Sequence, residues 1–413
     1  MVRYLLRRAG YSLLVLWGVV TVVFFLFNLS PGDPVRNLVG ENAPAEVVEQ
    51  IRRKLNLDIP VHQRYFYYLN DLLPLSLYTR DVEGSRRNYQ PDTQGGCILA
   101  GDQQILVLKW PDLKRSFLSD RPVSGLLAEA MPGTAVLAFV SIALALLAGL
   151  LLGMIAALRR DTAADRFILL VSALGMAGPS FFVAILVAWL GAVVWRDAIV
   201  VHVLPWLVLG ASWWLLRRRG RAPGLVLVAI FIGSWTICAW AVPGGWWNPV
   251  ITLPGTGLSM TGSLYSVNAF DGPYLDLRNL ILPALTLAVR PLAVIVQLTR
   301  SSILDVLSQD YIRTARAKGL SSSRILVGHA LRNALNPVIT AVSGWFASLL
   351  AGAVFVEFVF GWKGLGQELF MAIEKQDMPV VMGGVILIAS LFVGINMLVD
   401  VLYGWVDPRV RRA

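Results

Sequence analysis

The hydrophobic residues of this chain are gathered into runs of roughly 20 residues, without alternation of apolar and polar positions inside them. The runs lie near 9–29, 133–158, 167–195, 198–216, 222–243, 280–300, 334–356 and 381–405. A helix of this length crosses the hydrocarbon core of a bilayer, whereas membrane β-strands are about ten residues long and alternate in polarity. The pattern therefore predicts an all-α membrane protein, a polytopic helical bundle with about eight spans.

Basic residues between these runs indicate an orientation. If the N-terminus is cytoplasmic, the arginine clusters at 159–160, 217–219 and 411–412 all fall on the cytoplasmic side, where positive charge is favoured. The loop at 30–132 also carries basic residues, but long loops translocate largely regardless of charge. The first run is followed by NLSPGDP rather than by a signal-peptide cleavage site, so we expect a retained helix and two cytoplasmic termini.

The short runs at 198–216 and 222–243 are joined by the basic turn LRRRGRAP. If only one of them crossed the membrane, every basic cluster downstream would face outward, against the positive-inside bias. We therefore expect both to cross, as a transmembrane hairpin. Its many tryptophans are typical of anchors at the membrane interface.

Composition agrees with a membrane protein: 56% of the residues are hydrophobic and 15% are charged, against about a quarter charged in soluble domains. The net charge of +10 follows the membrane topology, so no nucleic acid is expected as a partner. Two cysteines, Cys97 and Cys238, and three histidines are scattered, which predicts neither a disulfide framework nor a metal site. The chain has no Walker-type phosphate loop, so we expect it to bind no nucleotide.

The stretch DYIRTARAKGLSSSRILVGHALRNALNP, residues 310–337, interrupts the apolar pattern. Its first half continues the preceding run as one helix over 302–318, with apolar residues at steps of three and four. Gly319 is predicted to cap that helix, because glycine takes a positive φ without penalty. Ser321–Ser323 would cap a second helix, with a stripe of Val327, Ala330, Leu331 and Ala334, and Asn336–Pro337 would reset the backbone before the next span.

Basic and small residues alternate in front of the glycine of this stretch. A solvated cytoplasmic loop explains the basic residues but not the small ones, which leave room for another protein to approach closely. The predicted docking surface consists of Arg313, Thr314, Ala315, Arg316, Ala317, Lys318 and Gly319.

The segment YIRTARAKGL…HALRNALNPVIT resembles the coupling loop of permease subunits of ATP-binding-cassette importers, of the dipeptide, oligopeptide and nickel group. Further blocks resemble this family in the same order: RYLLRR, LSPGDPV at 29–35, LNLDIPV at 55–61, GPSFFVAIL at 178–186, ILPALTLAVRPLA at 281–293, VEFVFGWKGLGQEL at 356–369 and DMPVVMG…LVDVLYGWVDPRVR at 377–411. They cover most of the chain. The broader importer motif has Glu-Ala-Ala where this chain has Arg313, Thr314 and Ala315. The docking prediction therefore does not depend on an acidic residue.

The resemblance implies a type I importer permease core of six helices, to which the hairpin is an insertion. The implied organisation is a first transmembrane helix (1–29), an extracytoplasmic loop region (30–132), core helices (133–197), the inserted hairpin (198–243), an extracytoplasmic loop (244–279), and core helices (280–413) with the coupling loop 301–333. The membrane would be the inner membrane of a bacterial or archaeal cell.

The same resemblance implies a transport subunit rather than an enzyme. Its partners would be membrane lipid, a second homologous permease subunit, two ATPase subunits that bind ATP and Mg²⁺, and an extracytoplasmic substrate-binding protein. The chain itself would bind no cofactor, and its cargo would be di- and oligopeptides, with nickel complexes or oligosaccharides as alternatives. A secondary transporter would need internal repeats and intramembrane ion-coupling residues, which the sequence does not show. A membrane enzyme would need a paired catalytic set, which is missing as well.

A few residues inside the runs stand out from their apolar neighbours. Arg290 lies within a predicted span, where a charge is costly unless it is paired or hydrated. It is therefore a candidate for the translocation path or for a buried ion pair. Asp400 is one possible partner in such a pair. Asn396 and Asp400 share a helix face and are candidates for interhelical hydrogen bonds. Gly149 and Gly153 offer a close-approach helix face, and Gly175–Pro179 is predicted to kink or interrupt the third span.

Overall fold

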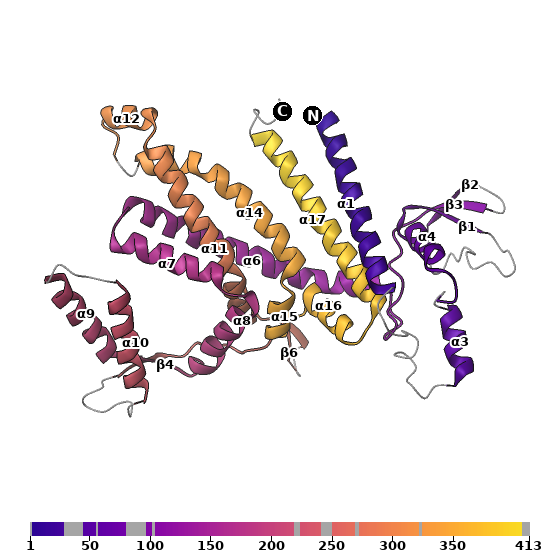
Figure 1. The fold of residues 1–413 in the computed structure, drawn as a ribbon, viewed down its shortest axis with the longest axis horizontal. Helices are drawn as coiled ribbons and strands as arrows, with labels where there is room; N and C mark the ends of the chain where they lie inside the picture. The colour runs from indigo at the N-terminus through magenta and orange to yellow at the C-terminus, as the bar shows by residue number, and fades with distance from the viewer. Residues whose placement is uncertain are drawn as a thin grey trace. The chain divides into compact units, whose positions relative to one another are not determined.

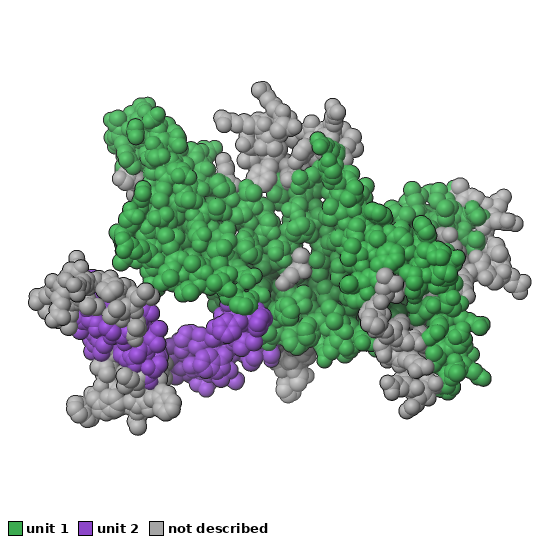
Figure 2. Space-filling model, in the orientation of Figure 1, with its two compact units in different colours: residues 1–180, 284–413 green, residues 181–283 purple. Residues whose placement is uncertain are grey.

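The computed structural model describes residues 2–28, 44–54, 57–79, 96–100, 104–218, 224–240, 250–268, 272–321 and 324–406. Helices dominate these residues, which confirms the predicted helical class. The chain divides into two compact units: residues 1–180 with 284–413 form the first, and residues 181–283 form the second (Figure 2).

Within the described parts of the chain, four helices are long and apolar enough to cross a membrane. They lie within α1 (Val2–Asn28), α6 (Val123–Leu158), α11 (Arg278–Leu307) and α17 (Met378–Val406). Two broken pairs raise the number to as many as six in the described residues: α7 (Ala163–Ala177) with α8 (Ser180–Trp189) and the π-helix η1 (Leu190–Val194), and α14 (Arg332–Gly352) with α15 (Val354–Phe360).

The first unit has its core where α6, α11 and α14 meet. Ala145, Ala288, Ile295 and Val338 form one buried cluster there. Two glycines of α6 face α11, because a Cβ on Gly149 would lie 2.6 Å from the Ile295 side chain and a Cβ on Gly153 would lie 2.6 Å from that of Thr299. The predicted close-approach face is therefore a contact within this chain. Helix α14 also packs against α17, and α17 packs against α1 (Figure 1).

The predicted interruption of the third span is confirmed at Gly178 and Pro179. Gly178 ends α7 in an extended conformation, and α8 begins at Ser180. The prediction that Asn336–Pro337 would separate two helices is wrong, because α14 runs through Pro337. Proline is tolerated inside membrane helices where local π-type adjustments re-satisfy the backbone, and the π-helix η2 (Ile325–Leu331) directly precedes α14.

A small sheet, absent from the sequence prediction, lies in the region between α1 and α6. Helices α3 (Ala45–Lys54) and α4 (Val61–Leu72) precede strands β1 (Leu75–Thr79), β2 (Cys97–Ala100) and β3 (Gln104–Leu108), which form an antiparallel sheet in the order β1-β3-β2. Leu75 pairs with Leu108 and Tyr78 with Ile105. Tyr78, Ile105 and Val107 form its buried side.

Helix α16 (Leu365–Glu374) follows α15 and packs against α6 and α17. Asp377, in the turn between α16 and α17, accepts hydrogen bonds from the Ser116 hydroxyl at 2.5 Å and from the Phe117 amide at 3.0 Å. These contacts attach the turn to the segment that leads into α6.

The second unit contains the predicted hairpin as α9 (Val203–Arg218) and α10 (Gly224–Trp240), which pack on each other. Residues 198–202, expected to start a helix, instead form strand β4 (Ala198–His202), which pairs with β5 (Val250–Pro254) because β-branched residues repeat there. Strands β6 (Tyr265–Asn268) and β7 (Gly272–Leu275) form another ribbon. With 16 and 17 residues, α9 and α10 are shorter than the roughly 20 of a typical span, so the count of eight spans stays a prediction.

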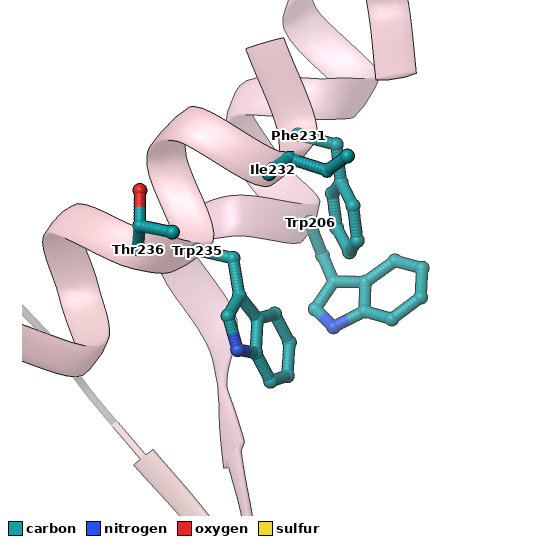
Figure 3. Close-up of a pocket in the computed structure, with 5 residues that line it drawn as sticks. All are labelled: Trp206, Phe231, Ile232, Trp235 and Thr236. Atoms are coloured by element: carbon teal, nitrogen blue, oxygen red, sulfur yellow. The ribbon is translucent and has the colours of Figure 1, made fainter. Parts of the chain in front are cut away.

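Aromatic side chains line an open groove on this hairpin (Figure 3). The Phe231 ring contacts both tryptophan rings, with its centroid 4.9 Å from that of Trp206 and 5.8 Å from that of Trp235. Ile232 and Thr236 complete the lining. The expected role of these tryptophans as interfacial anchors stays a prediction, and Trp246 and Trp247 lie outside the described residues.

Candidate functional site

The predicted docking stretch forms a separate short helix, α12 (Asp310–Ala317). It lies at the same end of the first unit as the start of α1 and the end of α17, and opposite α15 and α16 (Figure 1). The predicted continuous helix over 302–318 is wrong, because α11 ends at Leu307. Ser308 closes the end of α11, since its hydroxyl donates to the Asp305 carbonyl at 2.7 Å, and Gln309 then turns extended.

One side of α12 is anchored to the bundle by apolar contacts. Ile312 and Ala315 are buried, and with Ile325 they form a small core against the last turn of α11. The α11 contacts come from Val306 and Leu307. Ala315, predicted as part of the docking surface, is only 7% exposed and faces this core instead. The correction follows from helical spacing, because position 315 shares a face with position 312.

The opposite side of α12 is exposed and basic. The exposed members of the predicted set are Arg313, Thr314, Arg316, Ala317, Lys318 and Gly319. Arg313 reaches Asp310 at 3.4 Å, an exposed pair that contributes only about 0–1 kcal/mol. The structure thus separates a buried apolar side, which fixes the helix, from a solvent-facing basic side available for contact.

Gly319 ends α12 in the conformation that the sequence predicts. Its φ is +77°, its amide donates to the Arg316 carbonyl at 2.9 Å, and the Leu320 amide donates to the Ala315 carbonyl at 3.3 Å. This pair of bonds is the Schellman motif, and Leu320 packs against the α12 core as the motif requires. A Cβ at Gly319 would meet no atom within 4 Å, so glycine is needed there for its backbone conformation and not for space.

The second helix of the stretch begins with η2 and continues as α14. Ala330 and Ala334 are buried, and Ala334 packs with Ala157 and Ile303, as the predicted stripe requires. Val327 is exposed, so its place in that stripe is a wrong prediction: the π-helical turn changes the residue spacing of the face. The Asn333 amide donates to the Tyr311 hydroxyl at 2.8 Å and connects α14 to α12.

An ion pair that the sequence did not predict lies next to this region. Arg300 of α11 donates from Nε to Asp165 Oδ1 at 2.6 Å and from a terminal nitrogen to Oδ2 at 2.7 Å. Asp165 lies in the first turn of α7, is 2% exposed, and also accepts the Asp161 amide at 2.9 Å. The pair therefore joins α7 to α11, about two turns before the end of α11. The arginine at the end of an apolar run was visible in the sequence, but its partner 135 residues away was not.

Arg290 lies on α11 near the break between α7 and α8. A terminal nitrogen of its guanidinium donates to the Gly178 carbonyl at 3.1 Å. Its Nε atom is buried and has no hydrogen-bond partner among the described residues. Asp400, the partner considered from the sequence, has a side chain outside the described residues.

Within the described residues, Asn396 bonds inside its own helix, and the interhelical contact expected of it stays a prediction. Its amide donates to the Phe392 carbonyl one turn earlier in the same helix, at 2.8 Å. This local bond is a common alternative for polar side chains in membrane helices, because every backbone carbonyl offers a second lone pair.

A buried carboxylate, also missed from the sequence, holds the other end of the first unit together. Glu357 of α15 has no exposed surface and accepts hydrogen bonds from the Thr134 hydroxyl of α6 at 2.7 Å and from the Gly366 amide at 2.7 Å. The Gln367 amide donates to it at 3.1 Å. Both amides belong to the first turn of α16, where the helix dipole favours a negative charge. Glu357 therefore caps α16 and ties it to α6.

The first unit is thus a bundle of whole and broken helices, with a capped basic helix anchored at one end. Residues 149–412 match the family of binding-protein-dependent transport system inner membrane components, and the chain belongs to this family. Residues 1–84 match the N-terminal part of the same kind of membrane component. The protein is thus a multi-pass inner-membrane subunit related to peptide-transport permeases.

Three relatives illustrate the similarity. The di/tripeptide transport system permease protein DppB of Pseudomonas aeruginosa is 34% identical over 415 residues, covering 100% of this chain and 99% of the relative. The dipeptide transport system permease protein DppB of Escherichia coli is 31% identical, with coverage of 100% and 99%. The probable D,D-dipeptide transport system permease protein DdpB of Escherichia coli is 32% identical, with coverage of 99% and 97%.

Proposed function

We propose that this chain forms half of the path through which an ATP-driven importer carries di- and oligopeptides across the inner membrane. The cargo is supported by the names of full-length relatives, which describe permeases for dipeptides, tripeptides and D,D-dipeptides. A second homologous permease subunit completes the path, and an extracytoplasmic binding protein delivers the peptide. The chain binds no cofactor of its own, since ATP and Mg²⁺ belong to two partner ATPase subunits.

The observation that carries this proposal is the two-sided character of α12. Its buried side is packed on α11 by Ile312 and Ala315, so a displacement of α12 must displace α11. Its other side is exposed and offers Arg313, Arg316 and Lys318 to a partner. We assign this surface to the contact with an ATPase subunit, whose closure on ATP would tilt the spans. Arg290 remains a candidate for the path, tested by whether Arg290→Ala lowers uptake while the complex still assembles.

Gly319→Val should uncouple the importer. Placing a β-branched residue in the left-handed backbone conformation costs about 1–3 kcal/mol of conformational free energy. The substitution would therefore disrupt the C-terminal cap that ends α12. We expect the spans to insert and peptide uptake to fall several-fold, with ATPase subunits lost on purification or hydrolysing ATP without transport. Uptake and ATP hydrolysis in proteoliposomes, together with the amount of copurified ATPase, measure this.

Two variants serve as controls for that experiment. Gly319→Asn should stay close to wild type, because asparagine tolerates the same backbone conformation. Arg316→Glu should have a smaller effect, because one exposed ion pair contributes only about 0–1 kcal/mol. Normal, coupled transport by Gly319→Val would show that residues 313–319 are only a solvated loop.

We expect the start of α1, the end of α17 and the α12 surface all to be cytoplasmic, and their position at the same end of the first unit supports a shared side (Figure 1). For the hairpin, we expect the turn at residue 220, which lies outside the described residues, to be cytoplasmic and Thr261 to be external. In a background without Cys97 and Cys238, a membrane-impermeant thiol reagent on intact cells should label Thr261→Cys and not Gly220→Cys. The reverse labelling would overturn the eight-span topology.

A further inference from the structure

The contacts around α12 continue beyond α11 to a second span. Helix α12 is packed on Val306 and Leu307, in the last turn of α11. Two turns earlier on α11, Arg300 is bonded through two nitrogen atoms to both carboxylate oxygens of Asp165, in the first turn of α7. A continuous series of contacts therefore runs from α12 through α11 to α7, and α7 leads to the break at Gly178.

We propose that Asp165 and Arg300 are positioning residues for transport, which make α7 move together with α11 when the ATPase displaces α12. The inference rests on the proposed function of α12 and adds a named route by which its displacement reaches a second span. The pair would remain closed throughout the cycle, so that α7 and α11 move as one body.

The geometry of the pair suits such a role better than an apolar contact would. Apolar side chains can slide past one another, whereas two parallel N–H···O bonds between a planar guanidinium and a carboxylate fix both direction and axial position. The carboxylate of Asp165 is held further by the Asp161 amide, and the Thr162 hydroxyl caps α7. The Asp165 side chain is buried and that of Arg300 is 21% exposed. An ion pair removed from water contributes little net stability compared with an apolar replacement, so this arrangement is better explained by specificity of position.

A purely structural role makes a different prediction from a positioning role, and two conservative substitutions separate them. Arg300→Lys keeps the charge but cannot form the two-bond fork, and Asp165→Asn keeps the shape but loses the charge. We expect both complexes to assemble while the peptide imported per ATP hydrolysed falls by at least about tenfold, the lower end of the effect of losing one charge-assisted hydrogen bond. Arg166→Gln, at an exposed neighbour of Asp165, should leave this ratio unchanged.

A second experiment leaves the Arg300–Asp165 ion pair intact. It tests the proposal even if the Arg300→Lys and Asp165→Asn complexes do not assemble. Spin labels on Arg166→Cys and Ser301→Cys, both at exposed positions, report the distance between α7 and α11 in a complex whose ion pair is native. Labels on Ser301→Cys and Tyr11→Cys report the movement of α11 relative to α1. We expect the α7–α11 distance to be the same with and without trapped ATP, while the α11–α1 distance changes.

The inference is overturned if the α7–α11 distance changes on ATP binding, or if assembled Arg300→Lys and Asp165→Asn complexes keep the wild-type ratio of peptide to ATP. Its failure is distinguishable from a failure of the proposed function. If α12 does not contact an ATPase, Gly319→Val transports normally. If only this inference fails, Gly319→Val is uncoupled while Asp165→Asn remains coupled.

Discussion

Replacing Glu357 with alanine should prevent recovery of a stable permease. The substitution removes the acceptor for the Thr134 hydroxyl and for the amides of Gly366 and Gln367, all of which meet Glu357 in a buried site. Each buried donor left without a partner costs about 1–3 kcal/mol, so the total loss should be at least about 3 kcal/mol. The fraction of monodisperse protein after heating, followed by size-exclusion chromatography in mild detergent, measures the effect.

Glu368→Ala is the matched control, because Glu368 lies exposed on the same α16 helix. The heat resistance of Glu357→Gln should lie between those of Glu357→Ala and Glu368→Ala. The remaining oxygen of the glutamine side chain can still accept a hydrogen bond, but its NH₂ group faces donors and cannot accept from them. A Glu357→Ala permease as heat-resistant as Glu368→Ala would mean that the three donors find other partners, and that the connection between α6 and α16 does not depend on this carboxylate.

Enlarging Gly153 should separate α6 from α11. A Cβ at this position would lie 2.6 Å from the Thr299 Cβ and 2.9 Å from the Val296 carbonyl oxygen, so Gly153→Val cannot be accommodated unless a helix backbone moves. Overpacking of this kind costs about 1–3 kcal/mol or more. Gly344→Val is the matched control, because Gly344 lies in the interior of α14 with open space around it. The same heating assay should show a loss for Gly153→Val only.

If Gly153→Val and Gly344→Val behave alike, the close approach of α6 and α11 is not required for stability. A Gly149→Val variant extends the test to the neighbouring turn, where a Cβ would lie 2.6 Å from the Ile295 side chain. The two glycines should then give effects of similar size, because each faces one side chain and one backbone carbonyl oxygen of the same α11 surface.

Local features of the fold could be predicted from the sequence because they depend on a few neighbouring residues. The apolar runs predicted the helical class, Gly319 predicted the end of α12, and Gly178–Pro179 predicted the break after α7. Gly149 and Gly153 predicted a close approach, although not the helix that approaches. These features need only helical spacing and the conformational preferences of glycine and proline.

Features that depend on residues far apart in the chain were not predicted. Nothing near Asp165 in the sequence points to Arg300, and nothing near Glu357 points to Thr134, which lies 223 residues away. The break at Ser308 and the helical Pro337 likewise depend on packing around them and on the adjacent π-helix. Within the candidate site, the exposed basic positions could be predicted, whereas the side chains that anchor α12 and join it to other spans required the structure.

The π-helix η2 has a consequence for the length of the chain between α12 and α14. Its hydrogen bonds run from residue i to i+5, so the segment holds an extra residue compared with an α-helix of equal rise. Ile325 at its start belongs to the α12 core, and Ala334 just after its end packs on Ala157 and Ile303. An α-helix that kept all of these residues would rotate α14 by about 100° relative to α12. The π-helix takes up the extra residue, so deleting one residue from 325–331 should give an α-helix and leave the rotational phase between α12 and α14 unchanged.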